Sequence, residues 1–151
     1  VIPNLLFQGG DRNSVDSDLS NDGRGFPGYF TEDDINWESI LIGESKKKEL
    51  EGLGFKSDTD IVSEKLDRYS VAMANDGADT NGSQFFIVTA SFDDARIDYL
   101  NGRFTVIGKI FSGFDIIDKI NKVELNSTDP NNPRPIINII INKVRIVTSQ
   151  K

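Results

Sequence analysis

Short apolar runs separated by polar loops divide the chain into predicted strands. The most distinct run covers residues 84–90 (Gln-Phe-Phe-Ile-Val-Thr-Ala), whose aromatic and β-branched residues are typical of a buried strand. The same kind of pattern predicts further strands over 1–7, 69–74, 104–110 and 136–147. The strands outnumber the predicted helices, which indicates a mainly β chain of the barrel or sandwich type.

Two short helices are predicted between these strands. The first covers Ser45–Leu53, with Ser45 as its N-cap and Gly54 at the C′ position. The second covers 114–123, where apolar residues recur at helical spacing (Phe114, Ile117 and Ile120). Polar, glycine-containing stretches predict loops over 11–28, 56–67 and 124–135.

Composition narrows the classes of function. The 151 residues suggest one domain, and 17 basic against 24 acidic side chains give a net charge of −7. An acidic chain without a basic run lacks the phosphate-neutralising surface that nucleic acids require, so no nucleic-acid partner is expected. The absence of His and Cys excludes Ser-His-Asp triads, thiolate chemistry and Cys-type zinc sites, so neither a metal nor a cofactor is expected.

No apolar stretch approaches the roughly 20 residues that a membrane-spanning helix needs. The apolar start of the chain, residues 1–7, lacks the basic region and cleavage site of a signal peptide. The cytoplasm is therefore the favoured compartment, although the sequence leaves the compartment open.

Two glycine-containing motifs are better explained as loops. Residues 18–23 resemble the opening of a calcium-binding loop, but Tyr29 occupies the twelfth position, where calcium needs a bidentate acid. Residues 23–28 are rich in glycine but lack the Lys-Ser/Thr of a phosphate-binding loop. We interpret them as a loop that needs positive φ angles.

The most informative segments are 7–11 and 73–87. In the second, small amides and glycines lead directly into paired aromatic residues. One interpretation is a tight turn that enters a core strand. The other is a peptide groove, in which amide side chains (Gln8, Asn75 and Gln84) bind an extended backbone while an apolar pocket around Phe86 accepts a side chain.

Both segments resemble signature stretches of the cyclophilin family of peptidyl-prolyl cis-trans isomerases. The similarity continues, with matching order and spacing, through residues 99–109, 113–120, 134–135 and 141–146. The loop 23–30, followed by acidic residues, is similar to the prokaryotic branch of the family. Residues 36–65 are expected to be an insertion within one cyclophilin-like domain that covers 1–151.

The resemblance implies a closed, eight-stranded antiparallel barrel capped by two helices. It also implies catalysis of rotation about X–Pro peptide bonds, without a cofactor, in proline-containing peptides and unfolded proteins. The proline pocket is implied to be lined by four apolar residues, with a fifth at its edge: Leu5, Leu6, Phe86 and Leu100, then Phe104. The backbone of the substrate is implied to contact Gln8, Asn75 and the main chain of Ala74. A neighbouring pocket is implied to be shaped by Thr80, Asn81, Gly82 and Gln84, with Tyr99 where many members have Trp.

Three substitutions distinguish this chain from the usual family pattern. Leu5, Leu6 and Phe104 stand where the family usually has Phe, Met and His, and all three keep apolar bulk. A proline pocket is therefore still expected. Phe104 and Tyr99 replace a polar ring and an indole, so weak cyclosporin binding is expected.

The catalytic Arg of the family lies immediately before the residue that matches Val1. The first two strands and the first helix of the family fold also precede that position. We therefore expect a longer natural protein, and we predict that residues 1–151 alone are inactive. The alternative function is a non-catalytic module that binds proline-containing peptides or scaffolds a complex.

Overall fold

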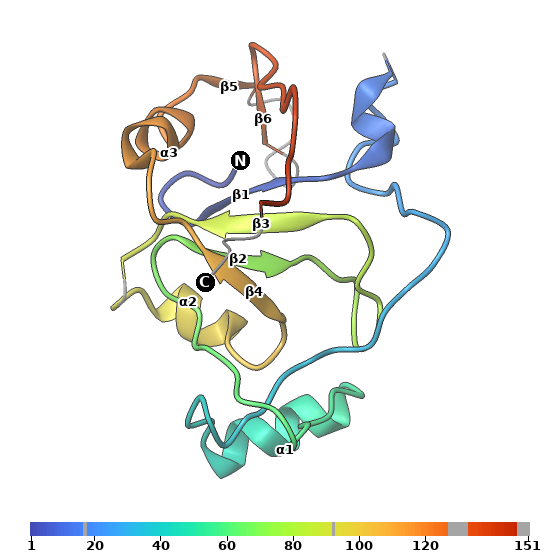
Figure 1. The fold of residues 1–151 in the computed structure, drawn as a ribbon, viewed down its shortest axis with the longest axis vertical. Coiled ribbons are helices and arrows are strands. Elements are labelled where there is room, and N and C mark those ends of the chain that lie inside the picture. The colour runs from blue at the N-terminus through green and yellow to red at the C-terminus, as the bar shows by residue number, and fades with distance from the viewer. Residues whose placement is uncertain (17, 92, 127–132, 148–151) are drawn as a thin grey trace.

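The computed structural model describes residues 1–16, 18–91, 93–126 and 133–147. A small antiparallel sheet lies at the centre, with helices above and below it in the view of Figure 1. The strands are β1 (Leu6–Gly9), β2 (Ser70–Met73), β3 (Phe85–Val88), β4 (Val106–Lys109), β5 (Leu125–Asn126) and β6 (Arg134–Pro135). The helices are the 3₁₀ turn η1 (Arg12–Val15) and the α-helices α1 (Glu44–Gly52), α2 (Ala95–Leu100) and α3 (Phe114–Ile120).

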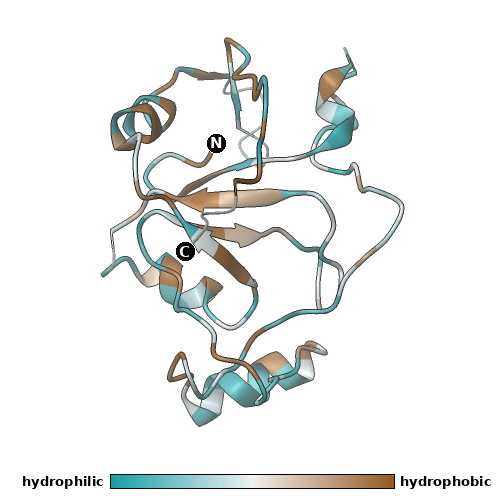
Figure 2. Cartoon of the chain, in the orientation of Figure 1, coloured by the Kyte–Doolittle hydropathy of each residue, from teal (hydrophilic) through white to brown (hydrophobic). Residues whose placement is uncertain are grey.

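The central sheet has four strands in the order β1-β3-β2-β4, all paired antiparallel. Its strands are among the hydrophobic segments in Figure 2. Gln8 pairs with Phe86 across β1 and β3, and Ala72 pairs with Phe86 across β2 and β3. β3 therefore lies in the interior of the sheet, as its aromatic and β-branched sequence predicts. The strand predictions over 69–74, 84–90 and 104–110 are confirmed in shortened form, and β1 lies at the end of the predicted strand 1–7.

The predicted strand over 136–147 is wrong. These residues form no strand, and their apolar side chains are exposed, with Ile137 at 83% and Ile146 at 95%. A barrel closes only when its first and last strands exchange hydrogen bonds. The described residues contain one four-stranded and one two-stranded sheet, with no pairing that closes them, so the closed barrel is not present in this part of the chain.

The loop predicted over 124–135 contains a short exception. β5 and β6 pair antiparallel within it, at Leu125 with Pro135 and at Asn126 with Arg134. The remainder of that loop, 127–132, lies outside the described residues.

Helix α1 confirms the first predicted helix and corrects its N-cap. Gly43 is the N-cap in place of Ser45, and no side chain caps the helix there. Gly54 does occupy the C′ position, with φ of +91°. Its N–H donates to the carbonyl of Glu51 at 3.0 Å, and the N–H of Phe55 donates to the carbonyl of Leu50 at 3.0 Å, which completes a Schellman motif.

The other two helices differ in how well the sequence predicts them. α3 confirms the second predicted helix, with Ile117 as its buried residue. α2 was not predicted, because its six residues are too few to show an apolar period. Its N-cap is Asp94, whose carboxylate accepts from the N–H of Arg96 at 2.9 Å.

Two separate hydrophobic clusters form the core. The sheet cluster contains Leu66, Ala72, Phe86, Val88, Ala90 and Ile97. The second cluster, which we call the α1 cluster, contains Ile35, Trp37, Ile40, Ile42, Leu50 and Phe55. Most of the α1 cluster belongs to the predicted insertion 36–65, which therefore buries apolar side chains of its own.

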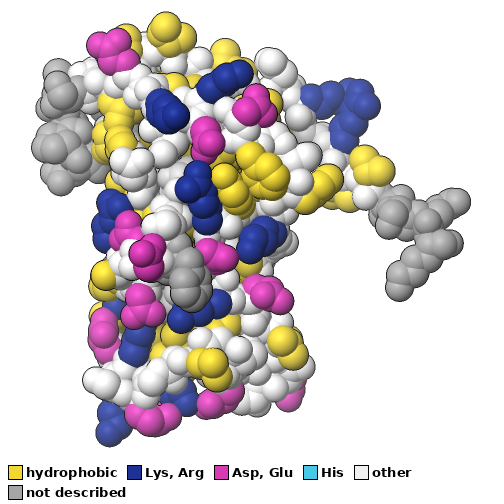
Figure 3. Space-filling model, turned by 90° about the vertical axis from the view of Figure 1, so that its left-hand side faces the viewer, with side chains coloured by type: hydrophobic (Ala, Val, Ile, Leu, Met, Phe, Trp, Pro, Cys, Tyr) yellow, Lys and Arg dark blue, Asp and Glu magenta, His cyan; other side chains and the backbone are white. Residues whose placement is uncertain are grey.

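Charges of both signs are mixed on one face of the molecule. Lys and Arg side chains are interspersed with Asp and Glu side chains on the face shown in Figure 3, with hydrophobic side chains between them. No helix in the described ranges is long and apolar enough to cross a membrane.

Candidate functional site

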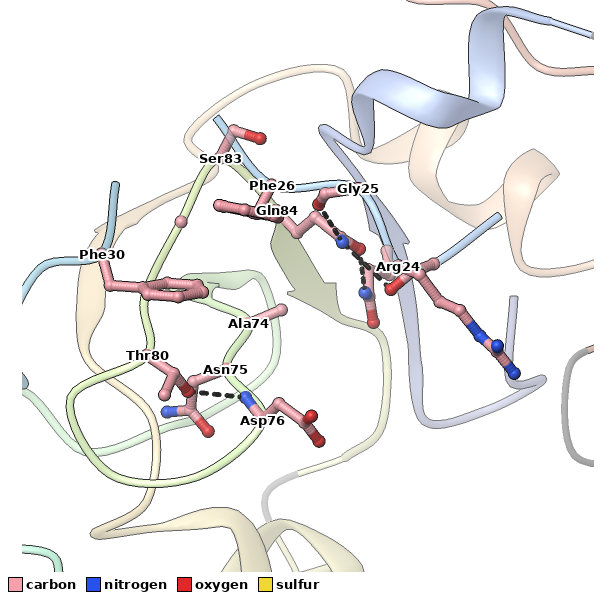
Figure 4. Close-up of a pocket in the computed structure, with 13 residues that line it drawn as sticks. Arg24, Gly25, Phe26, Phe30, Ala74, Asn75, Asp76, Thr80, Ser83 and Gln84 are labelled. Carbon is pink, nitrogen blue, oxygen red and sulfur yellow. Dashed lines mark hydrogen bonds between the residues drawn. The ribbon is translucent and has the colours of Figure 1, made fainter. Parts of the chain in front are cut away.

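A cavity of about 550 Å³ lies between the loop 23–30 and the loop 74–84 (Figure 4). Its volume falls within the range of sites that bind small molecules or peptide side chains. Its lining residues are Gln8, Gly23, Arg24, Gly25, Phe26, Phe30, Ala74, Asn75, Asp76, Thr80, Gly82, Ser83 and Gln84. Backbone and small side chains dominate one wall, and two aromatic rings form part of the other.

A ladder of amide groups connects the two loops. The Gln8 Nε2 donates to the Gln84 Oε1 at 2.7 Å. The Gln84 Nε2 in turn donates to the carbonyls of Gly25 at 2.8 Å and Gly23 at 3.1 Å (Figure 4). The β1–β3 pairing places Gln8 beside this edge of the sheet, since Gly9 pairs with Phe85, the residue after Gln84. The glycine-rich loop is thus held against the sheet by a side chain that also faces the cavity.

Phe26 and Phe30 form the aromatic part of the wall. Their rings stack with centroids 5.2 Å apart and planes inclined by 18°. Both rings are about half exposed, at 49% and 55%. In Figure 4 the Phe30 ring lies over the side of the cavity that Ala74 and Thr80 form, whereas the Arg24 side chain extends away from it. Such a half-exposed stack offers an apolar surface to a ligand.

The floor of the loop 74–84 is fixed by the buried amide of Asn81 and the partly buried amide of Asn75. Asn81 is 1% exposed, and its Nδ2 donates to the Asp33 Oδ1 at 2.7 Å and to the carbonyl of Glu32 at 3.1 Å. The Asn75 Nδ2 donates to the carbonyl of Arg103 at 2.8 Å. Burial raises the pKa of Asp33, while hydrogen bonds from Asp79, Asn81 and Asn75 oppose that rise. Asn81 therefore lies behind the cavity wall, where it holds the loop in place.

The five predicted proline-pocket residues lie together, next to the cavity but outside its lining. Phe86 is 2% exposed within the sheet cluster, and the other four predicted pocket residues are among the partly buried side chains that pack against that cluster: Leu5, Leu6, Leu100 and Phe104. Phe104 meets Phe86 edge to face, with ring centroids 5.2 Å apart. The five apolar residues, from three separate segments, thus all belong to the sheet cluster or pack against it, and we call them the apolar group.

The predicted site thus divides into three parts. The cavity brings together six of the predicted residues: Gln8, Ala74, Asn75, Thr80, Gly82 and Gln84. The apolar group contains five, and Asn81 supports the wall. Tyr99 stands apart: it is 60% exposed, and the Arg103 guanidinium carbon lies 4.4 Å from the centre of its ring.

Sequence reasoning missed the residues that the glycine-rich loop brings to the cavity. Positive φ angles at Gly23 and Gly28 confirm that this loop needs glycine, but the loop also lines the cavity. The available signal was the pair of aromatic residues, Phe26 and Phe30, in a loop too polar to bury them. Asp76 and Ser83 were missed because no pattern distinguishes them from other turn residues.

No group of three or more His, Cys, Asp or Glu side chains in the described ranges could hold a metal ion. This includes the acidic loop at 18–23. The lining of the cavity offers amide, hydroxyl and backbone hydrogen-bonding groups, the charged side chains of Arg24 and Asp76, and the rings of Phe26 and Phe30.

Comparison with known proteins identifies the family. The sequence model described as "Cyclophilin type peptidyl-prolyl cis-trans isomerase/CLD" matches residues 1–146. The chain therefore belongs to the cyclophilin-type peptidyl-prolyl cis-trans isomerase family.

Two curated relatives illustrate the match. Peptidyl-prolyl cis-trans isomerase CYP18-1 of Arabidopsis thaliana is 39% identical over 79 residues, which cover 52% of this chain and 44% of the relative. Peptidyl-prolyl cis-trans isomerase-like 1 of Gibberella zeae is 29% identical over 151 residues, which cover 100% of this chain and 70% of the relative. The first match spans less than half the length of the relative.

A solved structure shows the same fold. It is a Cryptosporidium parvum cyclophilin type peptidyl-prolyl cis-trans isomerase, crystallised in the presence of the dipeptide Ala-Pro. The TM-score is 0.55 at 22% sequence identity, over 89% of this chain and 63% of the other. The mainly β fold is therefore of the cyclophilin type.

Proposed function

We propose that the whole protein is a peptidyl-prolyl cis-trans isomerase that acts on proline-containing peptides and unfolded proteins. The reaction is rotation about an X–Pro bond, whose barrier of about 18–20 kcal/mol arises from amide resonance. It needs no nucleophile, metal or redox group, so a chain without His or Cys can perform it. The names of the relatives support this activity.

One structural observation carries the proposal: polar and apolar binding groups lie side by side on one face of the sheet, where β1 pairs with β3. Gln8 pairs directly with Phe86 across β1 and β3. Leu6 and Gln8 are two residues apart, as are Gln84 and Phe86, so each pair points to one side of its segment. An extended peptide along this face would meet amides at one position and the apolar group at the next.

We expect different residues of the site to bind different parts of the substrate. The apolar group would hold the proline ring, while the cavity would accept the side chain of a residue near it in the peptide. Gln8 would hydrogen-bond the substrate backbone. The Asn75 side chain donates to Arg103, and the N–H of Ala74 donates to the carbonyl of Gln84 at 2.9 Å. Asn75 and Ala74 would therefore contact a peptide through their main-chain carbonyls.

We also propose that the natural protein forms the closed eight-stranded barrel of the family, in which 36–65 is an insertion. The four-stranded sheet would be one part of that barrel. The exposed apolar side chains of 136–147 support this proposal, because pairing with further strands would bury them. Cyclosporin is expected to bind weakly because Phe104 and Tyr99 replace the usual ring residues.

Exchange spectroscopy on a blocked Ala-Ala-Pro-Phe peptide tests the proposed activity. The full natural protein, at substoichiometric concentration, should accelerate cis–trans exchange of the Ala-Pro bond. Gln8→Ala should lower kcat/KM about fivefold, the value of one hydrogen bond of about 1 kcal/mol. Phe111→Ala is the matched control, because Phe111 is 90% exposed and outside the site. Binding of the peptide without acceleration would favour the non-catalytic module. The absence of both binding and acceleration would refute both functions.

The residue before Val1 in the natural reading frame gives a second test. An Arg at that position would supply the donor that the family uses at the amide nitrogen. Another residue there would favour the non-catalytic module.

A further inference from the structure

The predicted insertion 36–65 contacts the turn that follows α2, at Gly102 and Arg103, and Ala78 of the loop 74–84 also packs against the α1 cluster. The helix α1 lies below the sheet in Figure 1, beneath the turn between α2 and β4. None of the residues 36–65 lines the cavity, so this segment does not obstruct it. The turn comprises residues 101–105; Phe104 within it and Leu100 immediately before it belong to the apolar group.

The closest contact involves Trp37, the only Trp in the sequence. Its Nε1 donates to the carbonyl of Gly102 at 3.1 Å, and both groups are buried. Gly102 has φ of +84°, and a Cβ there would lie 2.8 Å from the Leu50 Cδ1 and 3.5 Å from the Trp37 Nε1. The backbone of the turn is thus pressed against the α1 cluster at a point that admits only glycine.

Polar contacts flank Gly102 both in the turn and in the helix α2 that precedes it. The side chain of Arg103 is 11% exposed and forms an ion pair with Glu49 of α1. Lys46 of α1 donates to the carbonyl of Asp98. The N–H of Asp34 donates to the Thr105 Oγ1 at 3.0 Å. Such a concentration of contacts over a few residues gives the turn little freedom to move.

Asn101 provides a further attachment from the linker that follows the α1 cluster. It is 1% exposed, and its Oδ1 accepts from the N–H of Leu66 at 2.8 Å. Its Nδ2 donates to the carbonyl of Ile97 in α2 at 3.2 Å. This single buried side chain therefore connects the linker, the turn and the helix α2.

The other side of the turn faces the sheet. Leu100 and Phe104 both pack against the sheet cluster, and Phe104 meets the ring of Phe86 edge to face. The turn therefore has the α1 cluster on one side and the apolar group on the other. A displacement of Gly102 would be transmitted to its near neighbours Leu100 and Phe104, since a packed interior has few voids to absorb it.

We infer that segment 36–65 acts as a positioning unit for the proline pocket, with Trp37 as its principal positioning residue. The inference rests on the proposed function, because it assigns the apolar group to proline binding. Trp37 contacts the turn and acts through Leu100 and Phe104. The proline ring stays in its pocket in both the ground state and the twisted state, so a displaced wall weakens both equally. Loss of the contact should raise KM and leave kcat nearly unchanged.

The test compares Trp37→Phe with Phe55→Leu in the full natural protein. Trp37→Phe keeps an aromatic ring but removes the N–H that binds Gly102. Phe55→Leu is the control, because it loosens the same α1 cluster at a residue that is not among the nearest neighbours of Gly102. The three atoms nearest a Cβ at Gly102 come from Leu50, Ile42 and Trp37. Two quantities are measured: KM and kcat for the Ala-Ala-Pro-Phe peptide, and amide hydrogen exchange of residues 100–105.

Trp37→Phe is expected to raise KM about fivefold, with kcat within twofold of wild type, and to accelerate exchange at 100–105 at least fivefold. Phe55→Leu should leave both quantities within twofold. An active wild type in which Trp37→Phe behaves like Phe55→Leu would overturn the inference. If wild type shows no isomerase activity, the proposed function fails and exchange alone decides. Unchanged exchange then overturns the inference, whereas faster exchange in Trp37→Phe supports the positioning of the turn.

Discussion

The amide groups of Gln8 and Gln84 meet at 2.7 Å, although 76 residues separate them in the sequence. Through this contact the strand β1 is linked to the residue that holds the glycine-rich loop. Gln84 faces Gly23 and Gly25 with its Nε2 and Gln8 with its Oε1. Its amide therefore satisfies donors and acceptors on both sides of the cavity, and neither a carboxylate nor an apolar side chain could replace it.

Replacement of Gln84 by Glu should release the loop in a pH-dependent manner. At pH 7 the carboxylate would repel the two glycine carbonyls, so kcat/KM for the proline peptide should fall about tenfold. Protonation of the new Glu, with an ordinary pKa of about 4.3, restores a donor at low pH. Relative to wild type, the activity of Gln84→Glu should recover as the pH falls toward 4. Gln84→Met is the control, since it lacks a donor at every pH, and equal pH profiles for the two variants would contradict this explanation.

Removal of the aromatic stack should alter peptide preference more than stability. Phe26→Ala should raise KM three- to tenfold for peptides with a large apolar side chain close to proline, and less for peptides with Ala there. The free energy of unfolding should change by less than about 1 kcal/mol, because both rings are half exposed. Peptide titrations and urea denaturation measure the two effects. Phe111→Ala should change neither, and an equal loss for every peptide would show that the ring does not select a side chain.

Asn81 should contribute to stability and not directly to peptide contact. Asn81→Ala removes the donor to the Asp33 carboxylate and the Glu32 carbonyl in a buried setting. The free energy of unfolding should fall by about 1–3 kcal/mol, the usual effect of leaving a buried polar group unpaired. Urea denaturation provides the measurement. The exposed Asn142→Ala should stay within about 0.5 kcal/mol of wild type. A similarly small effect at Asn81 would mean that the loop is held elsewhere.

Part of the stability of the fold at low pH should depend on the carboxyl group of Asp94, the N-cap of α2. Hydrogen bonds from the Arg96 side chain and backbone lower the pKa of Asp94 from 3.8 to about 2. A carboxyl whose pKa is lower in the folded state than in the unfolded state stabilises the fold at any pH above its unfolded-state pKa. That contribution is lost as the pH falls through the folded-state pKa. Wild type should therefore lose this contribution between about pH 4 and pH 2. Asp94→Asn keeps a capping side chain but does not titrate, so its melting temperature should fall less over that window. Parallel melting curves for the two proteins would argue against this role.

Some of the local elements and the family could be predicted from the amino-acid sequence. β3 follows from consecutive aromatic and β-branched residues, and α3 follows from apolar residues three apart. The C′ position of Gly54 was also predicted from the sequence, because only glycine readily adopts a positive φ. The segment 73–87 was sufficient for the resemblance to cyclophilins, which the match over 1–146 confirms.

Tertiary structure alone decided which distant segments meet. Phe26 and Phe30 join the cavity because Gln84 binds backbone carbonyls of their loop, and carbonyl groups leave no trace in a side-chain pattern. The α1 cluster is joined to the turn after α2 by the hydrogen bond from Trp37 to Gly102, which lies 65 residues later in the chain. The apolar residues 136–147 have a strand-like composition yet form no strand, because a strand forms only where a neighbour offers a ladder of hydrogen bonds. The spacing of apolar residues indicates which face of a single helix or strand is buried. The site, however, is formed by contacts between different helices, strands and loops.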